Sequence, residues 1–214
     1  MYKWILALAA MLSLGGCVTA SNMIDRADEH KPIDPQKAIV VGFVSEGFLT
    51  QPHGLNVLLK YHDPASQAKA TRIALTTLDQ NNEIRGTSHI MGNSFVYEVP
   101  AGTYEVTHWY YRFFDGFSAD QKTPLLFSVK PGDAVYIGNF HANSLTMCLS
   151  NRDDFAKAVV DIKKAHPFLA NVAITNLSHD LQFPGWPNTK ATDVFGKGLC
   201  KVKSPDDVVS SAAN

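Results

Sequence analysis

The chain has 214 residues, 19 of them basic and 20 acidic, and its formal net charge is −1. No block of five like charges occurs, so the sequence disfavours nucleic acid as a partner. With 45% hydrophobic and 18% charged residues, the composition excludes a chain that is disordered throughout, and the length suits one domain with tails.

The first 17 residues, MYKWILALAAMLSLGGC, contain one lysine, a short apolar stretch, and small residues before a cysteine. The apolar stretch has the length of a signal-peptide core and is too short to cross ~30 Å of hydrocarbon as a helix. We expect residues 1–16 to be a cleaved signal peptide.

The end of this stretch, Leu14, Gly15, Gly16 and Cys17, resembles the lipobox of bacterial lipoproteins. In that family the peptide is cut before the cysteine, whose sulfur carries a diacylglycerol and whose new amino group is acylated. The resemblance implies lipid attachment at Cys17. An Asp after the cysteine typically retains such proteins at the inner membrane, and because Val18 stands there, the periplasmic face of the outer membrane is implied. The alternative is an ordinary signal peptide that happens to contain a cysteine.

Residues 17–37 are polar after the cysteine, lack periodicity and contain two prolines. We expect a lipidated N-terminus and a flexible tether that spans on the order of 25 Å. The folded domain should cover residues 38–203, and residues 204–214 should form a disordered tail.

Short β-branched and aromatic runs alternate with turn signals between residues 38 and 149. Two regions, FVYEVPAGTYEVTHWYY and LLFSVKPGDAVYIGNF, each place a Pro/Gly turn between two such runs and predict β-hairpins. Further strands are expected at residues 38–44, 55–61, 70–78 and 145–149. The fold class is therefore mainly β: an immunoglobulin/transthyretin-like β-sandwich of about eight strands.

Residues 151–166, NRDDFAKAVVDIKKAH, predict one helix packed on the sandwich, because Phe155, Val159 and Ile162 recur at helical spacing. Ser150 or Asn151 would cap it, and Pro167 ends it. Beyond it, residues 172–175 predict a short β-like run and FPGWP an irregular segment.

VPAGTYEV, the later FSVKPGDAVYIGNF, and the helix DDFAKAVVDIKKAHP together resemble a group of uncharacterised Gram-negative envelope lipoproteins. Their domain is similar to the transthyretin-like or carboxypeptidase-regulatory-like β-sandwich. The resemblance covers residues 38–167 and implies a fold and a location. It carries over no functional residue beyond Cys17.

Cys148 and Cys200 remain once Cys17 is assigned to lipid. An even pair of cysteines in an oxidising compartment normally forms a bridge, so we expect a disulfide between them. Two separate buried thiols are the alternative.

Eight histidines are present, at positions 30, 53, 62, 89, 108, 141, 166 and 179, but none falls at a metal-motif spacing. His108 and His141 would approach each other if their strands were neighbours, without an obvious third ligand. We expect no metal site and no cofactor.

Nucleophilic catalysis has no clear signature either. Gly92, Asn93 and Ser94 lack the second glycine of a nucleophile elbow, and residues 178–180, Ser-His-Asp, are consecutive and cannot converge as a triad. We predict no catalytic residues.

Six of the nine residues in Trp109 to Phe117, WYYRFFDGF, are aromatic, more than one alternating face can bury. Either this run packs in the core, or it forms an exposed shelf around Arg112 for a glycan, peptide or protein. Trp109, Tyr111, Arg112 and Phe114 are the candidate surface residues.

Two classes of function follow. The favoured one is a non-catalytic binding or structural module of the cell envelope, held to the membrane by its lipid, with an envelope protein or glycan as partner. The alternative is a lipid-anchored hydrolase that acts on cell-wall or glycan material.

Overall fold

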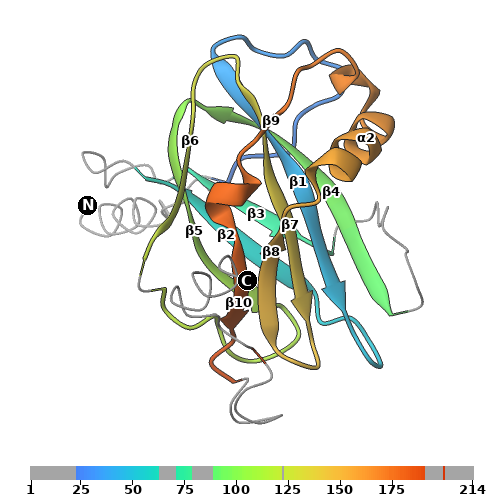
Figure 1. Cartoon of the computed structure of the whole chain (residues 1–214), viewed down its shortest axis with the longest axis vertical. Coiled ribbons are helices and arrows are strands. Elements are labelled where there is room, and N and C mark those ends of the chain that lie inside the picture. The colour runs from blue at the N-terminus through green and yellow to red at the C-terminus, as the bar shows by residue number, and fades with distance from the viewer. Residues whose placement is uncertain (1–22, 63–70, 79–88, 122, 191–199, 201–214) are drawn as a thin grey trace, which may run out of the picture.

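Two β-sheets pack face to face in the computed structural model, and one helix covers the outer face of the larger sheet (Figure 1). The structure describes residues 23–62, 71–78, 89–121, 123–190 and Cys200. The expected signal peptide, Cys17 and the expected C-terminal tail lie outside these residues.

The described residues form ten strands: β1 (Lys37–Gly47), β2 (Leu55–Tyr61), β3 (Arg72–Thr76), β4 (Ile90–Pro100), β5 (Gly102–Tyr111), β6 (Leu125–Val129), β7 (Ala134–Asn143), β8 (Cys148–Arg152), β9 (Thr175–Asn176) and β10 (Phe183–Pro187). The larger sheet has the order β10-β8-β7-β1-β4, with β9 added beside β7, and the smaller one has the order β3-β2-β5-β6. The predicted β-sandwich is confirmed.

Neither Pro/Gly turn closes a hairpin. β4 pairs with β1 and β5 with β2, so the turn at Ala101 carries the chain from the larger sheet to the smaller one. The turn before β7 likewise leads from β6 back to the larger sheet, where β7 lies parallel to β1. The local turn signals were correct, but both predicted hairpins were wrong, because a tight reversal does not determine with which strand each arm pairs.

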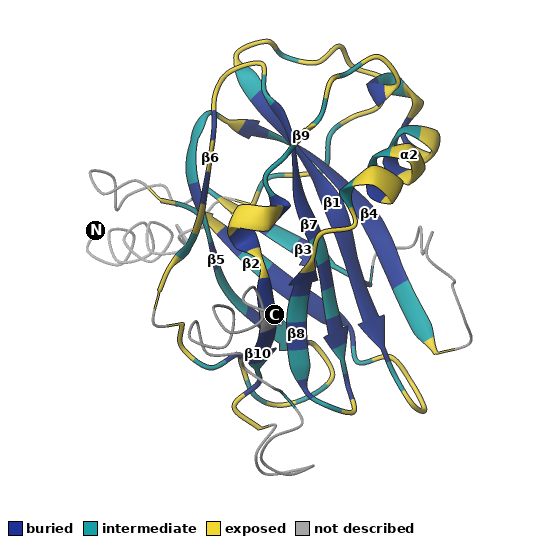
Figure 2. Cartoon of the chain, in the orientation of Figure 1, coloured by how far each residue is buried: buried dark blue, intermediate teal, exposed yellow. Residues whose placement is uncertain are grey.

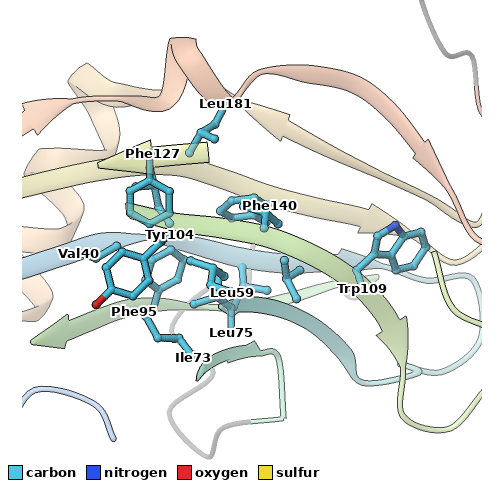
Figure 3. Close-up of a cluster of buried hydrophobic side chains, with 14 of the residues drawn as sticks. Val40, Leu59, Ile73, Leu75, Phe95, Tyr104, Trp109, Phe127, Phe140 and Leu181 are labelled. Atoms are coloured by element: carbon cyan, nitrogen blue, oxygen red, sulfur yellow. The ribbon is translucent and has the colours of Figure 1, made fainter. Parts of the chain in front are cut away.

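The inter-sheet core is built from alternate residues of both sheets, and large side chains from the two sheets meet at its centre (Figure 3). Val40 and Phe95 of the larger sheet face Leu59, Leu75 and Tyr104 of the smaller one. Each of these side chains is at most 1% exposed. Burial of this apolar surface, at roughly 25 cal/mol per Å², is the main force that holds the sheets together.

Two bulges change which residues face this core. In β5, Val106 pairs with Leu59 and His108 with Leu58, which leaves Thr107 unpaired. In β7, the register with β1 shifts at Gly138, whose φ of +122° favours glycine. A bulge adds one residue, so the alternation of inward and outward side chains reverses beyond it.

The helix α2 (Phe155–Ala165) lies on the larger sheet (Figure 2). Its residues Ala158 and Ile162 are buried against Ile39 and Tyr136. It begins four residues later than predicted, because residues 148–152 form β8 instead. Its N-cap is Asp154, without a side-chain capping bond. The 3₁₀ turns Pro167–Leu169 and Ser178–Leu181 follow, and FPGWP is strand β10 rather than an irregular segment.

Residues 23–29, here called the N-terminal segment, lie along one open side of the sandwich. Met23 bridges to Arg72 on β3 and Arg26 to Tyr97 on β4, while Ile24 packs on the inter-sheet core. The structure differs here from the flexible tether expected over residues 17–37, because apolar residues too few to show a period still fill the gap between the two edge strands.

The opposite side is closed by the loop after β5, where Phe117 bridges to Tyr110 and Ser118 to Asn188. Trp186 of β10 donates its indole N–H to the Ala119 carbonyl at 2.6 Å. The disulfide between Cys148 and Cys200, with Cα atoms 5.3 Å apart, ties residue 200 to β8. This confirms the predicted pairing.

Candidate functional site

The aromatic run divides between core and surface. Trp109 and Tyr111 are 0% and 1% exposed and pack edge to face in the core, where the Trp109 indole N–H donates to the Trp186 carbonyl at 3.1 Å. Phe114 is half-buried against the core, and Arg112 is exposed beside the Phe113 ring. Trp109 and Tyr111 therefore cannot present a surface to a ligand, and the core interpretation holds for both.

An aromatic cluster lies on the outer face of the smaller sheet, and two of its members belong to the predicted aromatic run but were not among the candidate surface residues. It consists of His108, Tyr110 and Phe117, here called the outer aromatic cluster. The Tyr110 ring centroid is 6.3 Å from that of His108 and 5.5 Å from that of Phe117, and Phe117 is 59% exposed. The bulge at Thr107 turns His108 and Tyr110 outward. The aromatic run was visible in the sequence, but only the pairing register shows which of its residues face outward.

The surroundings of this cluster combine apolar and cationic side chains. Leu58 pairs with His108 on the same face, Leu126 of β6 is 39% exposed, and Lys60 and Arg72 stand at one end. Burial, and then the charge of Arg72, lower the pKa of His108, so its imidazole is neutral at pH 7. α2 contacts β1 and β7 of the other sheet and does not cover this face in the described part of the chain.

A second arrangement joins a hydroxyl, an imidazole and a carboxylate. The Ser94 hydroxyl on β4 lies 2.8 Å from Nε2 of His166, and Nδ1 of His166 lies 2.7 Å from the Glu29 carboxylate. With a neutral ring, Nδ1–H donates to Glu29 and Nε2 accepts the Ser94 proton. This is the order of a catalytic triad, but Ser94 is 0% exposed beneath the helix end. As it stands, the chain of bonds fixes the N-terminal segment to the sandwich.

Sequence reasoning set Ser94 aside for lack of an elbow motif. Its partners come from positions 65 residues before and 72 residues after it, so only the tertiary structure unites them. Ser178, which the sequence places beside His179 and Asp180, donates to Asn176 Oδ1 at 2.7 Å and is fully buried.

His141 lies on the outer face of the larger sheet, directly beside Ser45, whose hydroxyl is 2.9 Å from its Nδ1. Burial, with a smaller contribution from Arg152, lowers the pKa of His141 to about 4. His141 and His108 belong to different sheets, so the condition for their approach, neighbouring strands, is not met. Among the residues that the structure describes, no three His, Cys, Asp or Glu side chains gather as metal ligands.

Glu46 is a fully buried acid at the end of β1. Its carboxylate oxygens accept the backbone N–H groups of Gly54 at 3.2 Å and Leu55 at 2.9 Å. Burial raises the pKa of Glu46, and the backbone donors oppose that shift. The Tyr111 hydroxyl is also buried, and burial together with the charge of Glu46 raises its pKa. Glu46 thus holds the loop before β2 and faces no solvent.

Within its described residues the structure contains no helix that is both long and apolar enough to cross a bilayer. Comparison of the chain with family models, curated proteins and solved structures finds no match.

Proposed function

We propose that this protein is a lipid-anchored, non-catalytic binding module of the bacterial cell envelope, held through Cys17 on the periplasmic face of the outer membrane. The outer aromatic cluster is the observation that carries the binding role. Its three adjacent rings lie on a sheet face that contributes nothing to the inter-sheet core, and Phe117 leaves more than half of its surface in water. Exposed apolar groups gathered in this way mark contact sites.

The disulfide supports the proposed location. Disulfides persist in oxidising compartments such as the periplasm and are rare in the cytosol. The sequence has three cysteines, and Cys148 and Cys200 are paired. This leaves Cys17 as the one cysteine for lipid.

Palmitate labelling of cells tests the anchor. The wild-type protein should take up label and fractionate with the outer membrane, whereas Cys17→Ser should be unlabelled and either soluble or uncleaved. Equal labelling of the two proteins would refute the anchor.

The binding role is tested with Phe117→Ser against Phe113→Ser. Phe113 is a matched control because it is 66% exposed and its ring lies beside Arg112 rather than in the outer aromatic cluster. Cross-linking in intact envelopes should weaken for Phe117→Ser alone. Equal cross-linking of both variants would contradict a binding role for the cluster.

A lipid-anchored hydrolase is the second candidate, and the hydrogen-bonded chain of Ser94, His166 and Glu29 is the observation that favours it. Ser94 would attack an ester or amide carbonyl, His166 would take its proton and Glu29 would stabilise the imidazolium. Because Ser94 is buried, the helix end must first move aside. A fluorophosphonate probe that labels the wild type but not Ser94→Ala would support this function, and an unlabelled wild type would exclude it.

A further inference from the structure

We propose that the outer aromatic cluster contacts the surface of the lipid bilayer itself, so that the smaller sheet lies with its outer face on the membrane. This inference rests on the proposed function, since it requires the lipid at Cys17. It identifies the lipid bilayer as the partner of the outer aromatic cluster.

The short distance along the chain between Cys17 and the edge of the smaller sheet supports contact with the bilayer. Met23 is fixed on Arg72, at the edge strand of the sheet that bears the cluster, and the Ile24 N–H donates to the Arg72 carbonyl at 2.8 Å. Only six residue steps separate Cys17 from Met23. At ~3.5 Å per residue they span at most about 20 Å. The edge of the smaller sheet therefore cannot stand far from the bilayer.

The register of the smaller sheet places the outer aromatic cluster close to Arg72, where the N-terminal segment meets the sheet. Thr76 pairs with Asn56, and Asn56 with Tyr110, so Tyr110 lies four residues along and two strands across from Arg72. With ~3.4 Å per residue and ~4.8 Å per strand, the two Cα atoms are roughly 17 Å apart. A sheet tethered at this edge brings its outer face to the membrane by a simple tilt.

The chemistry of the face fits the interfacial region of a bilayer. Tyr110, Phe117 and Leu126 offer two aromatic rings and an aliphatic side chain, and the exposed cations Lys60 and Arg72 stand beside them to meet lipid phosphates. On the same face Glu105 lies opposite Lys60 across the ladder, and its carboxylate is 3.4 Å from Nδ1 of His62. The acyl chains expected at Cys17 would hold the protein at the bilayer, and such a patch would add a second contact with the same surface.

The test places a tryptophan reporter on the mature lipidated protein in vesicles of phosphatidylethanolamine and phosphatidylglycerol with brominated acyl chains. Phe117→Trp and Leu126→Trp report on the face, and Val160→Trp, 65% exposed on α2 over the other sheet, is the matched control. The native Trp109 and Trp186 are buried and give a constant background. Two reporters are placed on this face so that, if one variant fails to fold, the other still tests the proposal.

We expect bromine to quench both face reporters at least twofold more than Val160→Trp. Equal quenching at all three sites, or none, in protein that floats with the vesicles would overturn the inference and leave the anchor intact. Protein that fails to float would refute the anchor and the inference together. Reporters that respond to isolated envelope glycan or protein but not to vesicles would assign the surface to that partner and overturn the inference.

Discussion

Replacing Trp109 by alanine should destabilise the sandwich more than any change at the neighbouring Tyr110. Trp109 is fully buried, and removal of such a side chain costs about 3–5 kcal/mol through lost burial and the cavity left behind. Its indole N–H also donates to the Trp186 carbonyl, a bond worth about 1 kcal/mol. We therefore expect a loss of roughly 4–6 kcal/mol in the free energy of unfolding.

Urea unfolding of the wild type, Trp109→Ala and Tyr110→Ala measures this loss. Tyr110 lies on the outer face, so Tyr110→Ala should cost about 1 kcal/mol or less, from its ring contacts with His108 and Phe117. Trp109→Phe, which keeps most of the ring, should fall between the two. Equal losses for Trp109→Ala and Tyr110→Ala would refute the register that the Thr107 bulge imposes.

Three further outcomes follow from other contacts. Cys200→Ser should lower stability by about 4 kcal/mol, because the bridge to Cys148 spans 52 residues, and an unchanged urea midpoint would contradict this. The pKa of His141 is about 4 in the folded protein against 6.5 in the unfolded chain, so its contribution to stability is fully present above pH 6.5 and is lost as the pH falls towards 4, by at most about 3 kcal/mol. His141→Gln should therefore flatten the fall of the unfolding free energy with decreasing pH, and an identical fall in wild type and variant would argue against the shifted pKa. Glu29→Gln should speed hydrogen exchange at residues 23–29, because it removes the charge that receives the His166 N–H, while Lys157→Gln, an exposed ion-pair residue on α2, should leave that exchange unaltered.

Local sequence signals located most of the elements. The β-branched runs at residues 38–44 and 55–61 became β1 and β2, because side chains of this kind pack well on a pleated sheet. The stripe of Phe155 and Ile162 correctly predicted a helix on a sheet face, and the parity of two remaining cysteines predicted the disulfide. These signals can be read from a short stretch of sequence or from the number of cysteines.

The candidate sites could not be predicted from any short stretch of sequence. A strict alternation along β5 from Tyr104 would have buried His108 and Tyr110 and exposed Trp109, and the opposite holds because Thr107 is bulged out of the ladder. The chain of Glu29, Ser94 and His166 likewise depends on three segments that meet only when the N-terminal segment and the helix end lie on β4.

By itself, the sequence determined a β-sandwich with one helix and a disulfide, because hydrophobic period, turn chemistry and cysteine parity are local or additive properties. Only the tertiary structure decided that both Pro/Gly turns cross between sheets, that β1 and β7 run parallel, and that two bulges set which aromatic side chains face water. The physical reason is that strand pairing and register are chosen by burial across the whole sandwich, where one inserted residue reverses the facing of every side chain that follows it.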